Sequence, residues 1–77
     1  MIWCVEFINL KKEKYSYLLD YEMKDCSVYL NGLRLIGHHE INIPGPVDFF
    51  IKSKAICLDP DLGIQDGDLL TIKGFRD

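Results

Sequence analysis

An Asn-Gly pair between two apolar runs constrains this chain more than any other feature of its sequence. Asn31-Gly32 follows Val28-Tyr29-Leu30 and precedes Leu33-Arg34-Leu35. A two-residue type I′ turn needs a positive φ at both central positions, which Asn and Gly tolerate best. The pair therefore predicts a β-hairpin, whose turn fixes the register of two strands and so decides which side chains face the core.

A helix is the alternative structure for the same segment. Apolar residues also recur at helical spacing between residues 26 and 36, and Asp25 could cap such a helix. Asn31 and Gly32 oppose it, because both are poor helix formers and Gly costs about 1 kcal/mol in a helix interior. In a hairpin turn the same glycine is favourable, so the hairpin is the preferred interpretation.

Alternating apolar and polar residues predict strands along the rest of the chain. In the second alternating run one face carries Tyr15, Tyr17, Leu19, Tyr21 and Met23. The Asp66-Gly67-Asp68 turn should open the closing strand of the same sheet system. The expected strands lie at 2–10, 15–23, 41–43, 47–51, 55–58 and 69–73, with the hairpin at 26–37 between them. We therefore expect one all-β domain over residues 1–77, a small antiparallel β-sandwich or barrel built on hairpins.

The first strand has large apolar side chains on both of its faces. Trp3, Val5 and Phe7 point one way, while Ile2, Cys4 and Ile8 point the other way together with Glu6. A domain of this size can bury one such face well, and the glutamate marks the second face as the less buried one. We therefore predict that Ile2, Cys4 and Ile8 meet a neighbouring subunit.

Composition excludes several classes of function. The net charge is −3, whereas nucleic-acid binders cluster Lys and Arg. No apolar run approaches the roughly 20 residues of a membrane span, and residues 1–6 do not resemble a signal peptide. Cys4, Cys26 and Cys57 are odd in number and lack CxxC spacing. Free thiols in a reducing cytoplasm are the simplest expectation for them.

Two polar clusters could in principle bind a metal ion, but neither has the required pattern. His38 and His39 are adjacent, so in an extended segment they point to opposite faces. The acidic residues between 59 and 68 lack the order of calcium ligands in an EF-hand, and Asp is also what turns require. Neither a nucleophile with its base nor a glycine-rich phosphate loop is recognisable. We expect neither an enzyme nor a bound metal or cofactor.

Residues 27–35, Ser-Val-Tyr-Leu-Asn-Gly-Leu-Arg-Leu, resemble the hairpin of small β domains in tailed-bacteriophage tail fibres and other virion appendages. In those modules the hairpin is followed by a short extended segment, a strand and a closing Gly-Asp strand. Residues 40–43, 47–58 and 67–72 fall in that order, so the resemblance covers about residues 15–75. One departure is His38-His39-Glu40, where family members usually have an acidic-aromatic pair.

The resemblance implies a structural subunit of a virion, assembled in the host cytoplasm. Family members are usually parts of long fibre proteins, so a free-standing copy would be an adaptor, collar, decoration or fibre-attachment subunit. Its partners would be other virion proteins and copies of itself. Nucleic acid, membranes and small-molecule substrates are not expected as partners.

Two other resemblances compete with this one. Residues 62–70 resemble the ending of small bacterial ubiquitin-like proteins, whose β-grasp is an α+β fold. That fold requires a helix at 26–37, and the sequence lacks the terminal Gly-Gly of conjugated members, so it would imply an interaction module without conjugation activity. The third is a dimeric β-barrel antitoxin that binds DNA, which the net negative charge disfavours.

Overall fold

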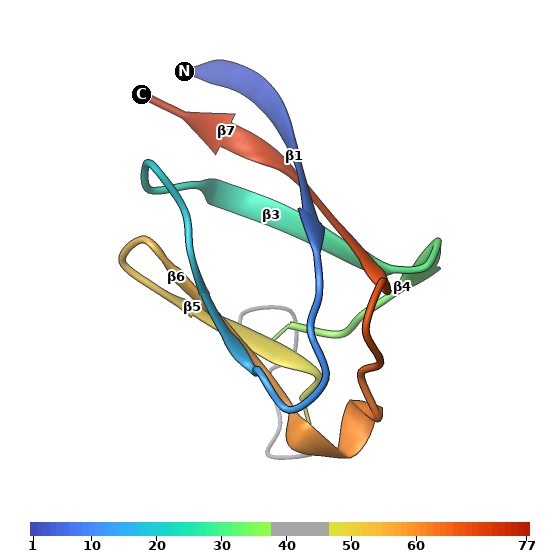
Figure 1. The fold of residues 1–77 in the computed structure, drawn as a ribbon. Helices are drawn as coiled ribbons and strands as arrows, with labels where there is room; N and C mark the ends of the chain where they lie inside the picture. Colours follow the sequence, from blue (N-terminus) through green and yellow to red (C-terminus); the bar gives the residue numbers. More distant parts are fainter. Residues whose placement is uncertain (38–46) are drawn as a thin grey trace.

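The computed structural model describes residues 1–37 and 47–77, in which seven strands form two antiparallel sheets. The four-stranded sheet has the order β1-β7-β3-β4, and the three-stranded sheet has the order β2-β6-β5 (Figure 1). A 3₁₀ turn, η2 (Pro60–Leu62), lies between β6 and β7. The strands are β1 (Ile2–Asn9), β2 (Ser16–Leu18), β3 (Lys24–Leu30), β4 (Leu33–Arg34), β5 (Phe49–Lys52), β6 (Ala55–Leu58) and β7 (Leu69–Arg76).

The predicted Asn-Gly hairpin is confirmed. Asn31 has φ 50° and Gly32 has φ 86°, the positive values that a type I′ turn requires. Leu30 and Leu33 lie opposite each other at the ends of β3 and β4. The β-grasp alternative is therefore wrong, because the segment that it needs as a helix forms β3, the turn and β4.

The closing strand β7 is the central element of the four-stranded sheet. It pairs with β1 from Ile2 opposite Arg76 to Asn9 opposite Leu69, and with β3 on its other side. Gly67 has φ 87° in the turn before it, as the Asp-Gly-Asp motif predicts. The strand is longer than the predicted 69–73, since pairing with β3 continues it to Phe75 and pairing with β1 continues it to Arg76.

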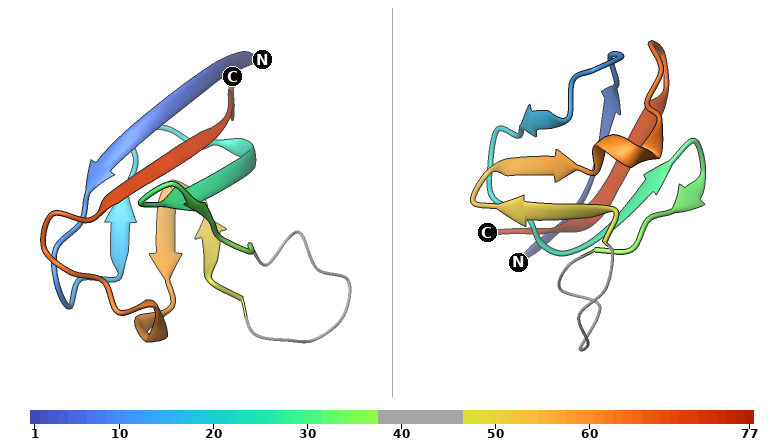
Figure 2. Two further views of the ribbon diagram at one scale, coloured as in Figure 1. Left: turned by 90° about the vertical axis from the view of Figure 1, so that its right-hand side faces the viewer. Right: turned by 90° about the horizontal axis from the view of Figure 1, so that it is seen from below.

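The hydrophobic core fills the space between the two sheets. Val28 and Ile72 enter it from the four-stranded sheet, and Phe49 and Ile56 from the three-stranded sheet; each is at most 1% exposed. Ile64 seals it from the loop after η2. Figure 2 shows the strands of one sheet crossing those of the other. The predicted all-β sandwich of antiparallel strands is confirmed.

The second predicted strand is shorter than its alternating pattern. Only Ser16–Leu18 belong to β2, after which Leu19 donates its N–H to the carbonyl of Lys54 (2.8 Å) and the chain crosses to the four-stranded sheet. The predicted inward face is nevertheless correct, because Tyr17, Leu19 and Met23 are buried. The strand predicted at 41–43 and the histidines at 38 and 39 lie outside the described residues.

The first strand is confirmed, but the assignment of its two faces was wrong. Cys4 and Ile8 pack against the core, whereas Trp3 and Phe7 are 55% and 65% exposed on the outer face. The charge of Glu6 indicated a less buried face, but Glu6 lies on the inward side, where the Tyr21 hydroxyl hydrogen-bonds it. Ile2 shares the inward side but is exposed at the end of the strand.

Candidate protein interface

The free edge of β1 is the first part of the candidate site. Among the described residues β1 pairs only with β7, so its other side is a sheet edge (Figure 2, left). Leu10, just after β1, donates its N–H to the carbonyl of Asp68 (2.8 Å) and so faces β7. Residues of an antiparallel ladder alternate between facing the partner and facing away. The backbone N–H and C=O groups of Trp3, Val5 and Phe7 are therefore directed toward the open edge.

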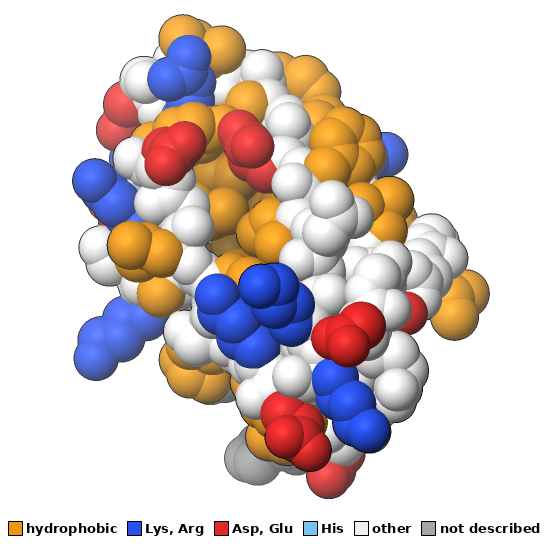
Figure 3. Space-filling model, in the orientation of Figure 1, with side chains coloured by type: hydrophobic (Ala, Val, Ile, Leu, Met, Phe, Trp, Pro, Cys, Tyr) orange, Lys and Arg blue, Asp and Glu red, His pale blue; other side chains and the backbone are white. Residues whose placement is uncertain are grey.

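An aromatic surface on the outer face of the four-stranded sheet adjoins this edge. Trp3 and Phe75 lie opposite each other and meet edge to face, with ring centroids 5.2 Å apart and an interplanar angle of 68°. Phe7 lies opposite Thr71 on the same face. Figure 3 shows hydrophobic side chains gathered along the upper right margin, where β1 runs. A contiguous exposed apolar surface of this kind marks an interaction site more often than scattered apolar residues do.

One basic group, Lys73, lies next to the aromatic surface, opposite Val5. The Lys73 Nζ atom lies 5.0 Å from the centroid of the Tyr29 ring, which is a cation–π distance. A shallow hollow of about 390 Å³ lies between Phe7 and this pair, with Thr71 and Gly32 also lining it. The hollow lies on the same outer face as Phe7, so a partner side chain could occupy it.

The inward side of β1 is held by the connection between β2 and β3. The Tyr21 hydroxyl donates to Glu6 Oε1, and the Arg76 guanidinium lies 4.9 Å from the Tyr21 ring centroid. The hydrogen bond to Glu6, then desolvation and then Cys4 raise the pKa of Tyr21 above its usual value. The single charged side chain of β1 is thus tied to the body of the domain and leaves the outer face of the strand uncharged.

The four turn residues singled out by the sequence are structural. Asn31 Nδ2 donates to Asp68 Oδ1 (3.1 Å), so the hairpin turn is bonded to the turn that Gly67 forms before β7. Hydrogen bonds from the Gln65 backbone N–H and from Asn31 lower the pKa of Asp68. Gly32 supplies the second positive φ of its turn.

Two of the other acidic residues between 59 and 68, Asp59 and Asp66, also accept hydrogen bonds from the backbone. Asp66 Oδ1 accepts from the Lys12 N–H (2.7 Å), and Asp59 Oδ1 accepts from the Asp61 N–H at the start of η2 (2.9 Å). Within residues 1–37 and 47–77 no group of three or more acidic, His or Cys side chains is placed to hold a metal ion. These contacts explain Asp59 as a cap of η2 and Asp66 as a turn former.

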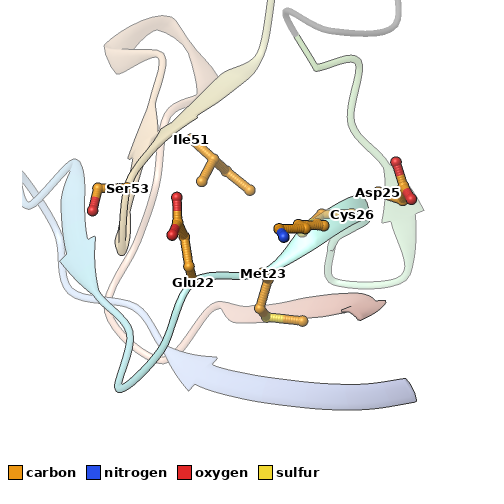
Figure 4. A pocket seen from close by; sticks show the side chains of 7 residues that line it. Glu22, Met23, Asp25, Cys26, Ile51 and Ser53 are labelled. Carbon is orange, nitrogen blue, oxygen red and sulfur yellow. The ribbon is translucent and has the colours of Figure 1, made fainter. Parts of the chain in front are cut away.

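Two further hollows lie away from β1. The larger, about 410 Å³, opens between the start of β3 and the β5–β6 hairpin, where Glu22 and Ser53 lie at one end and Asp25 at the other (Figure 4). Met23, which also lines it, points toward β1 and β7. The smaller, about 230 Å³, is apolar and includes Phe50 on the outer face of the three-stranded sheet. The larger hollow thus has a mixed lining of charged and apolar residues, whereas the smaller one has an almost wholly apolar surface.

The three cysteines are free thiols in different surroundings. Cys26 is buried, and burial, followed by the charges of Cys4 and Asp25, raises the pKa of its thiol to about 11. Cys4 and Cys57 are half-buried. A thiol with a raised pKa is a poor nucleophile, so Cys26 has the character of a core residue.

The predicted interface residues are thus only partly those that the structure exposes. Of Ile2, Cys4 and Ile8, only Ile2 is exposed, and the residues that sequence reasoning missed are Trp3 and Phe7. Strand alternation groups Trp3 with Phe7 but does not say which group faces outward.

The chain matches no family model, no curated protein and no solved structure. Across the described residues there is no helix with the length and apolar character of a membrane span.

Proposed function

We propose that this chain is a structural subunit of a bacteriophage virion that acts by assembling with other virion proteins. It would be a tail fibre-associated, adaptor, collar or decoration protein, assembled in the host cytoplasm. The observation that carries the assembly part is the free edge of β1 with Trp3 and Phe7 exposed beside it. The resemblance of the hairpin at 27–35 and of the strand at 67–72 to virion appendage domains supports the virion part.

The proposed mechanism of assembly is strand addition. A partner strand placed beside β1 would satisfy the outward N–H and C=O groups of Trp3, Val5 and Phe7. The aromatic side chains of Trp3 and Phe7 would be covered at the same time, and such a side chain contributes about 1.5–3 kcal/mol when fully buried. Tyr, Trp and Phe are the residues in which interface cores are enriched.

On this proposal the domain is not an enzyme. It takes no metal or cofactor, and it binds no nucleic acid, membrane or small-molecule substrate. Its specificity lies in the register and side chains of β1, since backbone hydrogen bonds alone accept any strand.

The test compares the occupancy of two variants in purified virions. Phe7→Glu changes the proposed interface, and Leu18→Glu is the matched control, because Leu18 is 80% exposed on the three-stranded sheet. We expect Phe7→Glu to lower occupancy about tenfold or more, which corresponds to about 1.4 kcal/mol, and Leu18→Glu to leave it unchanged. Normal occupancy of Phe7→Glu, or absence of the unmodified chain from virions, would reject the proposal.

A further inference from the structure

In β1, the residues two and three positions away from Val5 are similar on its two sides. On the outer face, the sequence of side chains is aromatic, β-branched, aromatic: Trp3, Val5, Phe7. On the inward face, Ile2 and Ile8 lie at equal distances from Val5. In two-fold symmetric pairing of a strand with its own copy, residue i of one copy meets residue j of the other and j meets i, so the two residues must be complementary. The aromatic pair Trp3–Phe7 and the aliphatic pair Ile2–Ile8 meet this condition.

We propose that a second copy of this chain pairs with β1, antiparallel and with Val5 opposite the partner copy's Val5. Trp3 of each copy then lies opposite Phe7 of the other, and Ile2 lies opposite Ile8. The two four-stranded sheets join into one continuous eight-stranded sheet. The inference rests on the proposed function, because it names the partner that meets the edge of β1 during assembly.

The backbone geometry fits this register. Trp3, Val5 and Phe7 all face the open edge, so the pairs Trp3–Phe7, Val5–Val5 and Phe7–Trp3 each exchange two N–H···O=C bonds, about six in all. In an antiparallel pair, the numbers of any two opposed residues add up to the same value. The outward-facing residues of the two copies lie opposite one another only when this sum is even, so the neighbouring registers change the sum by two.

Repulsion between like charges disfavours one of the two neighbouring registers. Glu6 is the single charged residue between Ile2 and Asn9. Moving the partner by one step toward Asn9 places Glu6 opposite Glu6, and directly opposed like charges destabilise a strand pair. In the proposed register Glu6 lies opposite Cys4 instead.

The aromatic residues disfavour the second neighbouring register. Moving the partner one step toward Met1 places Trp3 opposite Val5 and Cys4 opposite Cys4. This separates the two most exposed aromatic side chains of the strand, whereas the proposed register brings them together. Aromatic pairs across strands are among the more stabilising ones.

The edge also lacks most of the features that prevent such pairing. Protected edge strands carry Lys, Pro, a bulge or an inward-pointing charge. The single inward-pointing charge of β1, Glu6, is hydrogen-bonded by the Tyr21 hydroxyl. β1 contains neither Lys nor Pro, and its eight residues pair with β7 without a shift of register. The irregularity in the four-stranded sheet lies in β3, between Lys24 and Ser27.

The first test measures self-association of the full chain by sedimentation equilibrium from about 1 to 200 μM. We expect a dimer, and we expect Val5→Pro to raise its Kd about 30-fold or more, because proline removes the N–H groups that cross the two-fold axis. The β1–β7 ladder keeps its hydrogen bonds, since proline is tolerated where the N–H faces outward from an edge strand. The thermal melt of Val5→Pro verifies that it folds.

A second pair of variants, which introduces opposite charges at Trp3 and Phe7, tests the dimer if Val5→Pro does not fold. Phe7→Glu alone should weaken the dimer, and the double variant Trp3→Lys/Phe7→Glu should restore part of the affinity by pairing opposite charges across the interface. A double variant no tighter than Phe7→Glu would contradict the register.

Disulfide capture tests the register directly, in a Cys57→Ser background. With Val5→Cys we expect a covalent dimer after mild oxidation, because directly opposed residues have Cα atoms about 5.5 Å apart, within reach of a disulfide. Without this substitution, a dimer linked through Cys4 would show the register shifted toward Met1 and would overturn ours.

These outcomes separate the two proposals. A chain that remains monomeric up to 200 μM but occupies virions overturns self-pairing and leaves the structural role standing. A dimer that never enters virions supports self-pairing and rejects the proposed function. A dimer whose Kd is unaffected by both Val5→Pro and Phe7→Glu overturns the assignment of β1.

Discussion

Asn31 and Asp68 join the two turns on which the four-stranded sheet depends. Asn31 Nδ2 donates to Asp68 Oδ1 (3.1 Å), and Asn31 Oδ1 accepts from the Leu69 N–H (2.9 Å). The Asn31 side chain therefore fixes the first residue of β7 against the end of β3. Asn31 thus has two roles. It forms its own turn with a positive φ, and its side chain connects this turn to another that is distant in the sequence.

Asp68 should make stability depend on pH. Its pKa is lowered from 3.8 by the Gln65 backbone and the Asn31 side chain, so the folded state favours the carboxylate. Its contribution is fully present above the unfolded value of 3.8 and is lost as the pH falls through the lower folded pKa. Urea unfolding between pH 7 and pH 2 should show this loss. Asp68→Asn should remove it, and Asp20→Asn, at an exposed position, should retain it.

Gly32→Val should destabilise the domain by about 1–3 kcal/mol through backbone strain, because a β-branched residue is then forced to positive φ. A Cβ atom at Gly32 meets no atom within 4 Å, so steric contact is not the cause. Gly32→Asn is the control, because Asn tolerates this region of φ and ψ. Thermal and urea unfolding measure the difference, and equal stability of the two variants would contradict the strain account.

Gly74→Ala should destabilise the domain through steric overlap and not through backbone strain. Gly74 lacks a positive φ, but its Cβ would lie 2.9 Å from the Lys24 carbonyl oxygen, 3.1 Å from Cys26 Sγ and 3.3 Å from Met23 Cε. We expect a loss of about 1–3 kcal/mol in the free energy of unfolding, as for overpacked cores. Adding Cys26→Ala should recover little of this loss, since the closest contact is with backbone. A full recovery would show that the sulfur contact is the limiting one.

Ile8→Glu and Phe7→Glu should separate folding from assembly. Ile8 packs against the core, so Ile8→Glu should cost roughly 3 kcal/mol of stability by placing a charge there. Phe7 is 65% exposed, so Phe7→Glu should change the free energy of unfolding by no more than about 0.5 kcal/mol. Circular dichroism melts of the two purified variants provide the measurement. A more stable Ile8→Glu variant would mean that the faces of β1 are assigned the wrong way round.

Cys26 should be the slowest thiol to react in the folded protein. Its side chain is buried and its pKa is raised to about 11, so little thiolate is present at pH 8. We expect iodoacetamide to modify Cys57 and Cys4 first, with Cys26 labelled at a comparable rate only after unfolding in urea. Peptide mass spectrometry resolves the three sites. Early labelling of Cys26 in the native state would show that this end of the core opens readily.

Local sequence patterns predicted most of the fold. The Asn31-Gly32 turn and the Asp-Gly-Asp turn are determined by residues that tolerate positive φ, and such requirements are visible in the sequence. Strand alternation likewise identified Tyr17, Leu19 and Met23 as one inward face. These signals are local, so no knowledge of the tertiary arrangement was needed.

The orientation of β1 could not be predicted in the same way. Both of its faces are apolar enough to be buried, and the choice depends on partners far away in the sequence. Glu6 appeared to mark a solvent face, but its hydrogen bond comes from Tyr21, which only the crossing of the β2–β3 connection brings near. The candidate interface followed this error, because Trp3 and Phe7 become visible as a surface once that crossing is known.

The central place of β7 has a consequence for the order in which the chain can fold. Ile2 lies opposite Arg76, so β1 has no partner in its sheet until the last strand has been synthesised. Pairings this distant in sequence close large loops, and domains dominated by them fold in milliseconds to seconds. Until β7 has been synthesised and has paired with it, both edges of β1 are unpaired. The segment would be a natural binding site for a chaperone during this time.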